Sequence, residues 1–181
     1  MSYYGIPGYR PRWLVGLADI TSAHGQRLSR LVGRPLSKSW LVWDQSDDEW
    51  FADCPVVLDF DGEQVEITHQ KFDELSITWN SIAPHQQRPW SYPEDNDPEI
   101  DAFHLSWRSD AITALTALEG QPLLAVDLLE WTSQRIDFAT GMIAVSFTFT
   151  SDRLTISNGL DENRLELGAP PVGYLHYPLR D

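Results

Sequence analysis

LSRLVGRPLSKSWLVW, residues 28–43, returns 87 positions later as LTALEGQPLLAVDLLEW, residues 115–131. Both stretches contain leucines at helical spacing, a Gly-x-Pro-Leu segment and a tryptophan that closes an apolar run. The repeat predicts an internal duplication, in which residues that serve the fold recur and a functional site sits where the copies differ. Further matching positions are Leu58, Phe60, Val65 and Ile67 in the first half and Phe147, Phe149, Leu154 and Ile156 in the second.

The second copy shows the periodicity of its elements clearly. A strand is expected at 103–107, followed by a helix with Ile112, Leu115 and Leu118 on one face, which Ser109 or Asp110 caps and Gly120 ends. An apolar strand then runs to residue 131. From 143 to 150, apolar and small polar residues alternate with a period of two, as in a strand with one buried face.

The first copy repeats this plan, and its strongest local signal is Asp61-Gly62. This dipeptide favours the positive φ angles of a two-residue hairpin turn. The predicted fold class is α+β, with two tandem copies of a β-α-β-β-β-type unit, one helix per unit and a pseudo-twofold relation between them. The pattern leaves open whether the antiparallel strands form one continuous sheet or two.

Segments rich in proline divide the chain. We expect an N-terminal arm at 1–12 laid over the body, a first repeat unit at 13–80, a Pro-rich acidic connection at 81–102, a second repeat unit at 103–168 and a C-terminal tail at 169–181. Each half is small, so the two units are expected to share one core.

The chain is strongly acidic, with a formal net charge of −14 over 181 residues. Eleven acidic side chains fall within residues 44–74, against Lys71 alone. Nucleic acid and anionic membranes are disfavoured as partners because both repel such a surface, so a basic protein is the better electrostatic match. The alternative is that the acidity serves only solubility.

The expected location is cytoplasmic. No apolar run is long enough for a membrane-spanning helix, and the N-terminus lacks the apolar core of a signal peptide. A single cysteine, Cys54, agrees with a reducing compartment. The oligomeric state is not indicated.

Two acidic segments are candidates for binding a partner. In the first, aromatic residues follow a run of carboxylates, as in recognition surfaces for basic proteins. In the second, the strand period places acidic side chains around the Asp61-Gly62 hairpin on an outward face. Loop aromatics also commonly fold back onto a core, and this alternative stays open. We expect these carboxylates to gather on one side of the molecule. The predicted partner-binding residues are Asp44, Asp47, Asp48, Glu49, Trp50, Phe51, Asp59, Asp61, Glu63 and Glu66.

His69 and Asn158 occupy matching places at the ends of two return strands, and an Asp-Glu pair follows each of them. The simplest interpretation is that both are structural polar residues that satisfy loop backbone. The alternative is a small-ligand pocket between the two repeats, with His69 and Asn158 in its wall.

Catalysis has little support in the sequence. Cys54 is in phase with apolar strand residues, so we expect a buried side chain and no nucleophile. Asp59, Asp61 and Glu66 lack the further ligands of a calcium loop, and the histidines show no zinc-binding spacing. We therefore expect no enzyme, no metal and no cofactor. An enzyme that uses those three carboxylates with a metal is the least favoured hypothesis.

The favoured hypothesis is a non-catalytic, acidic protein-binding module. One form of it is an immunity or inhibitor protein that covers the basic active site of a toxin or enzyme, where opposite charge would accelerate capture. The alternative is a small-ligand-binding or sensory domain with a pocket between the repeats.

Overall fold

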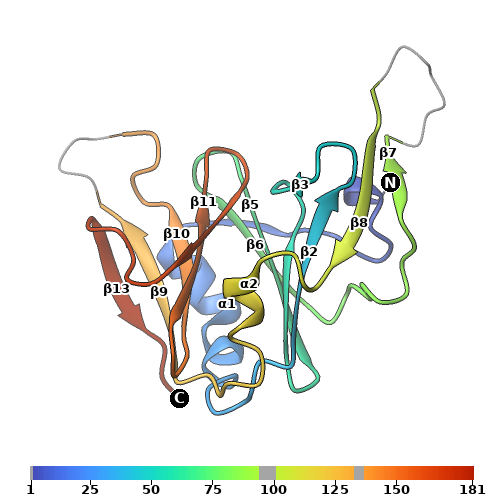
Figure 1. Ribbon diagram of the computed structural model, residues 1–181. Coiled ribbons are helices and arrows are strands. Elements are labelled where there is room, and N and C mark those ends of the chain that lie inside the picture. The colour runs from blue at the N-terminus through green and yellow to red at the C-terminus, as the bar shows by residue number, and fades with distance from the viewer. Residues whose placement is uncertain (1, 94–100, 133–136) are drawn as a thin grey trace.

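The computed structural model describes residues 2–93, 101–132 and 137–181 (Figure 1). These residues form two antiparallel sheets with few helices, so the fold class is α+β, as predicted. No helix within these ranges is long and apolar enough to cross a membrane. The helical elements are η1 Tyr3–Gly5, α1 Leu17–Ser29 and α2 Thr113–Thr116.

The strands of the first sheet lie in the order β1-β6-β5-β4-β2-β8-β7, and β3 pairs with β2. The Asp61-Gly62 hairpin is confirmed, because both residues have positive φ, 53° and 88°, and they join β4 to β5. β8 pairs with β2, so this sheet crosses the boundary between the two predicted repeat units. The strands are β1 Trp13–Val15, β2 Lys38–Asp44, β3 Glu49–Trp50, β4 Val56–Phe60, β5 Glu63–Gln70, β6 Glu74–Trp79, β7 Trp90–Tyr92 and β8 Phe103–Arg108.

The second sheet has the order β12-β11-β10-β9-β13. The predicted alternation is present in β10, where Ile143, Val145 and Phe147 enter the main core and Ala144 packs on the opposite face. Part of the predicted C-terminal tail is the edge strand β13, which pairs with β9. The strands are β9 Ala125–Trp131, β10 Ile143–Thr148, β11 Arg153–Asn158, β12 Asn163–Leu167 and β13 Tyr174–Pro178.

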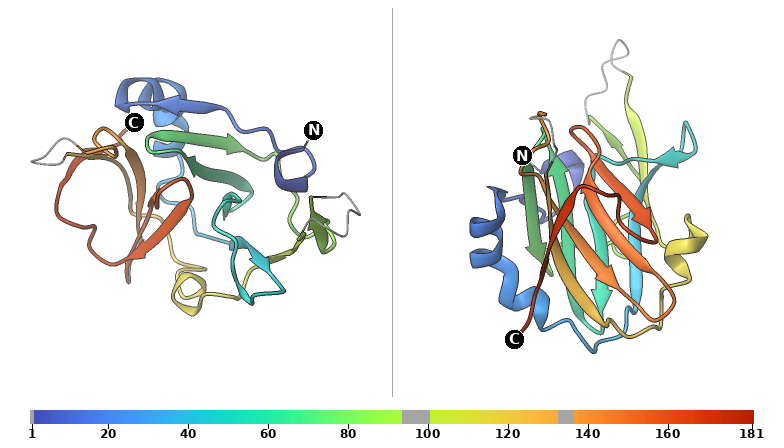
Figure 2. Two further views of the ribbon diagram at one scale, coloured as in Figure 1. Left: turned by 90° about the horizontal axis from the view of Figure 1, so that it is seen from above. Right: turned by 90° about the vertical axis from the view of Figure 1, so that its left-hand side faces the viewer.

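One hydrophobic core lies between the two sheets (Figure 2). Phe60 of the first sheet stacks on Phe147 of the second at a ring-centroid distance of 5.7 Å, and on Phe149 at 6.2 Å. All three side chains are almost completely removed from solvent. Burial of this apolar surface is the main force that holds the sheets together.

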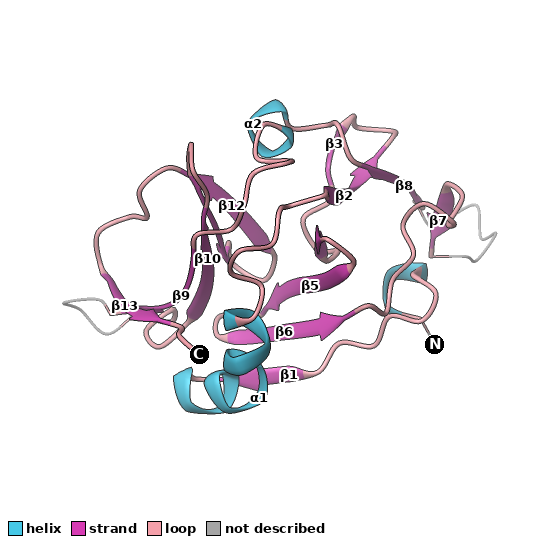
Figure 3. Ribbon diagram, turned by 90° about the horizontal axis from the view of Figure 1, so that it is seen from below, coloured by secondary structure: helices cyan, strands magenta, loops and turns pink. Residues whose placement is uncertain are grey.

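The two helices differ in length. α1 has thirteen residues and lies beside β1, burying Ile20 and Leu28 in the main core (Figure 3). α2 is a single turn, much shorter than the helix predicted from residue 110 to 120. Ile112 stands at its N-cap with no side-chain hydrogen bond, so neither Ser109 nor Asp110 is the cap. The Thr116 amide and hydroxyl both donate to the Ile112 carbonyl, and after Ala117 the backbone continues with i→i+3 bonds, from Leu118 to Leu115 and from Glu119 to Thr116.

Reciprocal hydrogen bonds join the two Gly-x-Pro-Leu segments. The Gly33 amide donates to the Leu123 carbonyl at 2.8 Å, and the Gly120 amide donates to the Leu36 carbonyl at 2.7 Å. Between them, Pro35 and Pro122 form an isolated antiparallel bridge. The first strands of the two predicted units are not equivalent, since β1 pairs with β6 of its own unit and β8 pairs with β2 of the other.

The segment before β1 packs on the first sheet, on the face opposite the main core. Ile6 and Tyr9 are buried there in a second hydrophobic cluster with Val57 and Leu105. The Tyr9 hydroxyl hydrogen-bonds the buried Thr68 hydroxyl on β5. Burial raises the pKa of Tyr9 well above its ordinary value. Both faces of the first sheet are therefore covered along these strands.

Candidate functional site

The predicted acidic residues lie at two opposite ends of the molecule. β2 pairs with β4 through Lys38 and Asp59 at its start, and with β3 through Asp44 and Glu49 at its end. Six residues of strand separate these ends, which corresponds to roughly 20 Å. The expectation of one continuous acidic face is therefore wrong, because antiparallel strands place successive turns at alternate ends.

We call one of these ends the loop end. It consists of the turns β2–β3 (residues 45–48), β5–β6 (71–73) and β11–β12 (159–162), which gather at the top of Figure 1. The Asp161 amide donates to the Lys71 carbonyl at 2.9 Å, and the Lys71 amide donates back to the Asp161 carboxylate. The Asn163 amide donates to the Ala52 carbonyl at 3.0 Å. These bonds fix turns from both halves of the chain side by side.

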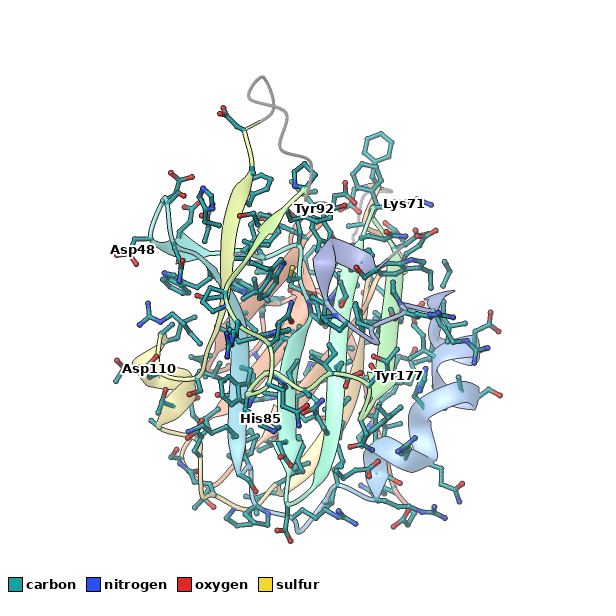
Figure 4. All side chains as sticks on the ribbon, turned by 90° about the vertical axis from the view of Figure 1, so that its right-hand side faces the viewer. Asp48, Lys71, His85, Tyr92, Asp110 and Tyr177 are labelled. Atoms are coloured by element: carbon teal, nitrogen blue, oxygen red, sulfur yellow. The ribbon has the colours of Figure 1, made fainter. Side chains whose placement is uncertain are left out.

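Carboxylates dominate the loop end. Asp47, Asp48 and Glu49 are exposed on the β2–β3 turn, and Figure 4 shows Asp48 and Lys71 at the same end of the molecule. Partial burial and the nearby Glu162 and Asp161 raise the pKa of Asp53. Mutual repulsion of this kind is relieved by a cation.

The basic groups nearby already have partners. The Lys71 ammonium lies 2.8 Å from Glu74. Arg108 stacks on the Trp43 ring at 4.9 Å and lies 4.0 Å from Asp48.

Exposed apolar side chains lie among these carboxylates. Phe72 is 46% exposed, Phe138 82% and Leu160 74%. The two phenylalanine rings stack at 5.4 Å, joining the β5–β6 turn to the segment before β10. Large exposed apolar groups gathered in one place are typical of binding surfaces. None of these three residues was predicted from the sequence, although a large apolar residue inside a turn sequence is a signal that could have found them.

Three of the predicted partner-binding residues at this end are turned inward. Asp44 is 3% exposed, and its carboxylate accepts a hydrogen bond from the Ser46 amide at 2.9 Å. Phe51 is 8% exposed and packs between the rings of Tyr4 and Phe103. Trp50 is half-buried against the main core. Asp44 and Phe51 are therefore corrected to structural residues.

The predicted residues at the opposite end have local partners. The Asp59 carboxylate accepts a hydrogen bond from the Gly62 amide at 2.8 Å, which closes the hairpin turn that contains Asp61. Glu63 lies 2.6 Å from the Arg27 guanidinium, which lowers the pKa of Glu63. Arg27 shares a shallow hollow with Arg30 and Arg34, so this end is mixed in charge.

Glu66 is completely buried, which corrects its assignment to an outward docking face. Its carboxylate accepts hydrogen bonds from the backbone amides of Ser81 and Ile82 at 2.7 and 3.0 Å. The Gln64 amide and the hydroxyls of Thr78 and Ser81 also donate to it. The chain after β6 crosses this face of the sheet, and Glu66 anchors it there.

His69 is buried between the sheets. Its Nε2 lies 3.0 Å from the Ile143 carbonyl, and its Nδ1 lies 3.0 Å from Asn163 Oδ1. The Asn163 amide group donates to the Cys54 carbonyl at 2.9 Å, which directs Oδ1 toward His69. Burial lowers the pKa of His69, although both acceptors oppose this shift.

Asn158 lies at the edge of a hollow of about 730 Å³. Its amide donates to the Gln70 carbonyl at 3.1 Å, and its Oδ1 accepts from the Leu160 amide at 3.0 Å. His69 is not part of the wall of this hollow, because Asn163 lies between the two. The two residues predicted to bind a small ligand are therefore separated, because Asn158 is accessible from the hollow and His69 is enclosed.

The side chains considered for catalysis are poorly placed for it. Cys54 is buried beside Val57 in the second hydrophobic cluster, and burial raises the pKa of its thiol well above its ordinary value. Within the described parts of the chain, no three His, Cys, Asp or Glu side chains are grouped so that they could hold a metal ion.

Comparison of the chain with protein-family models, with curated proteins and with solved structures finds no match.

Proposed function

We propose that the protein is a non-catalytic binding module that recognises a basic protein through its loop end. The observation that carries this proposal is the exposed group Phe72, Phe138 and Leu160 among the loop-end carboxylates. Apolar anchors inside a charged rim are the usual arrangement of a protein interface. The carboxylates would attract a basic surface and accelerate its association.

One concrete form of this function is an immunity or inhibitor protein that covers the basic active site of a toxin or enzyme. The single cysteine suits the cytoplasmic setting that such a protein needs. The interface in this proposal retains Asp47, Asp48 and Glu49 from the sequence analysis, with Asp53, Asp161 and Glu162 added. Asp59, Asp61 and Glu63 are left out because they lie at the other end.

The test is affinity capture from the native host with three forms of the protein. Asp47→Lys/Asp48→Lys reverses charge at the loop end, and Asp61→Lys/Glu63→Lys makes the same change in net charge at the other end. We expect a basic protein that is captured by the wild type and by the second variant and lost with the first. Retention by the first variant, or equal loss with both, would contradict the proposal.

The second candidate function is small-ligand binding, and the hollow beside Asn158 is the observation that favours it. Its volume is within the range of small-molecule sites. A ligand there would contact Asn158 and leave His69 untouched. The opposite pattern, in which a ligand perturbs the NMR signals of the His69 ring first, would place the site elsewhere.

We also propose that the two halves descend from one duplicated unit. The reciprocal bonds of Gly33 and Gly120 support this, since the two glycines are 87 positions apart and have φ angles of 91° and 83°. A Cβ at either would meet no atom within 4 Å, so backbone strain alone sets the cost of alanine there, about 1 kcal/mol. Gly33→Ala and Gly120→Ala should lower the free energy of unfolding equally. Unequal losses would argue against equivalent roles.

A further inference from the structure

The hollow beside Asn158 brings the two edge strands of the second sheet together. Glu166 lies on β12 and Tyr174 on β13, at opposite edges of the sheet, and both line this one space. The sheet must therefore curve around the hollow, and Figure 2 shows its strands arranged along an arc. Trp131 of β9 and Trp50 of β3 complete the aromatic part of the wall.

One oxygen of Glu166 has no partner. Its Oε1 lies 3.1 Å from the Arg164 guanidinium. Its Oε2 is shielded from solvent and accepts no hydrogen bond from any described residue. This oxygen has no room for a donor at hydrogen-bond distance, so the Glu166 carboxylate acts on a molecule in the hollow through its charge.

The charge of the wall determines which kind of ligand suits the hollow. Glu49, Asp137, Glu162 and Glu166 face the hollow with Arg164 as the one described basic residue, and Arg164 is already paired with Glu166. The aromatic rings add surfaces that attract cations through their π-electrons. A neutral molecule would lack the attraction to the carboxylates, and an anion would be repelled by them.

We propose that this hollow binds an organic cation, a guanidinium, amidinium or ammonium group carried on an apolar body, with the Glu166 carboxylate as a counter-charge in its wall. The apolar body lies against Trp131 and Tyr174. The proposal rests on the second candidate function and specifies its ligand. The hollow shares Glu49, Leu160 and Glu162 with the proposed protein interface, whereas Asp47 and Asp48 are not part of its wall, so charge reversal at these two residues separates the two proposals.

The test uses three probes of equal shape and different charge: benzamidine, benzamide and benzoate. The chain contains two methionines, and Met142 lines the hollow. In protein labelled with ¹³C at the methionine methyl groups, benzamidine should shift the Met142 signal. We expect binding at least tenfold tighter than that of benzamide and no response to benzoate. Equal responses to the three probes, or no response to benzamidine at 10 mM, would overturn the proposal.

Glu166→Gln tests the counter-charge, and Glu63→Gln is the matched control, because it removes the same charge at the opposite end. Glu166→Gln should weaken benzamidine binding about tenfold or more, and the control should bind as the wild type does. Unchanged affinity in folded Glu166→Gln refutes the assignment. If that variant does not fold, Tyr174→Leu removes an aromatic wall and should weaken binding about threefold or more.

Two sources could supply such a cation, a free small molecule or a side chain of a bound protein. Agmatine represents the first source, and a capped Gly-Arg-Gly peptide represents the second. Tighter binding of agmatine assigns the hollow to small molecules, and tighter binding of the peptide assigns it to a partner. The loop-end charge reversal Asp47→Lys/Asp48→Lys should leave benzamidine binding unchanged, so failure of protein capture and failure of this proposal remain distinguishable.

Discussion

His69 should make the protein less stable in mild acid. The imidazole is enclosed, and both of its nitrogens face acceptors, the Ile143 carbonyl and Asn163 Oδ1, whereas neutral imidazole has one N–H and can serve only one of them. Protonation would supply a donor for the second acceptor, but it would also place a charge in the interior between the sheets. Since burial lowers the pKa of His69, the folded protein keeps the neutral form while the unfolded chain takes up a proton below its ordinary pKa of 6.5.

The sign and size of the effect follow from proton linkage. Between the unfolded pKa and the lower folded pKa, the unfolded state binds more protons, so the free energy of unfolding decreases as pH falls. A group that titrates at 6.5 when unfolded contributes a loss of at most about 1.4 kcal/mol between pH 7.5 and 5.5, and the loss approaches this limit when the folded pKa lies below that range. His24 adds a loss of the same sign, because burial together with Arg12 and Arg27 lowers its pKa.

Urea unfolding at pH 7.5, 6.5 and 5.5 measures this effect, and the variant His69→Gln isolates the share of His69. Glutamine retains a donor for the Ile143 carbonyl and does not titrate. The wild type should lose more stability than the variant over this range, by up to about 1.4 kcal/mol. Equal pH dependence in both proteins would refute the reasoning. A wild type that gains stability in acid would show a buried imidazolium, in which the two acceptors outweigh desolvation.

Three further substitutions test other parts of the structure by urea unfolding. Glu66→Ala removes the acceptor for two backbone amides and three side chains and should cost about 3 kcal/mol or more, whereas a loss below 1 kcal/mol would show that water replaces the carboxylate. Tyr9→Phe deletes the hydrogen bond to Thr68 and should cost about 1 kcal/mol, and no loss would mean that the arm is held by apolar contact alone. Phe147→Ala opens the core between the sheets and should cost about 3–5 kcal/mol, so a mild effect would contradict a single shared core.

The sequence predicts the local features of this fold well. The Asp61-Gly62 turn and the alternation in β10 depend on residues next to each other in the chain, and both are present. The predicted helix was too long, because after Ala117 the backbone changes to i→i+3 hydrogen bonds and no side chain caps the start of α2. The pairing of β8 with β2 joins residues more than sixty positions apart, and strand periodicity carries no information about the choice of partner.

The candidate site was also predicted only where it depends on residues close together in the sequence. Acidic residues that are neighbours in sequence were expected on one face, but β4 and β5 carry Asp59, Asp61 and Glu63 to the far end. Strand alternation placed Glu66 outward correctly with respect to the main core, and it gave no warning that residues 81–82 would cover that face. Phe72, Phe138 and Leu160 come from three distant turns, so only the folded chain brings them together.

The hydrogen bonds between the Gly-x-Pro-Leu segments, together with the pairing of β8 to β2, tie the halves at two separate places. A chain cut between β7 and β8 should therefore give two fragments that are unfolded when alone and regain structure only when mixed. Such fragment complementation would report binding, because any ligand or partner that contacts both pieces should raise their affinity for each other.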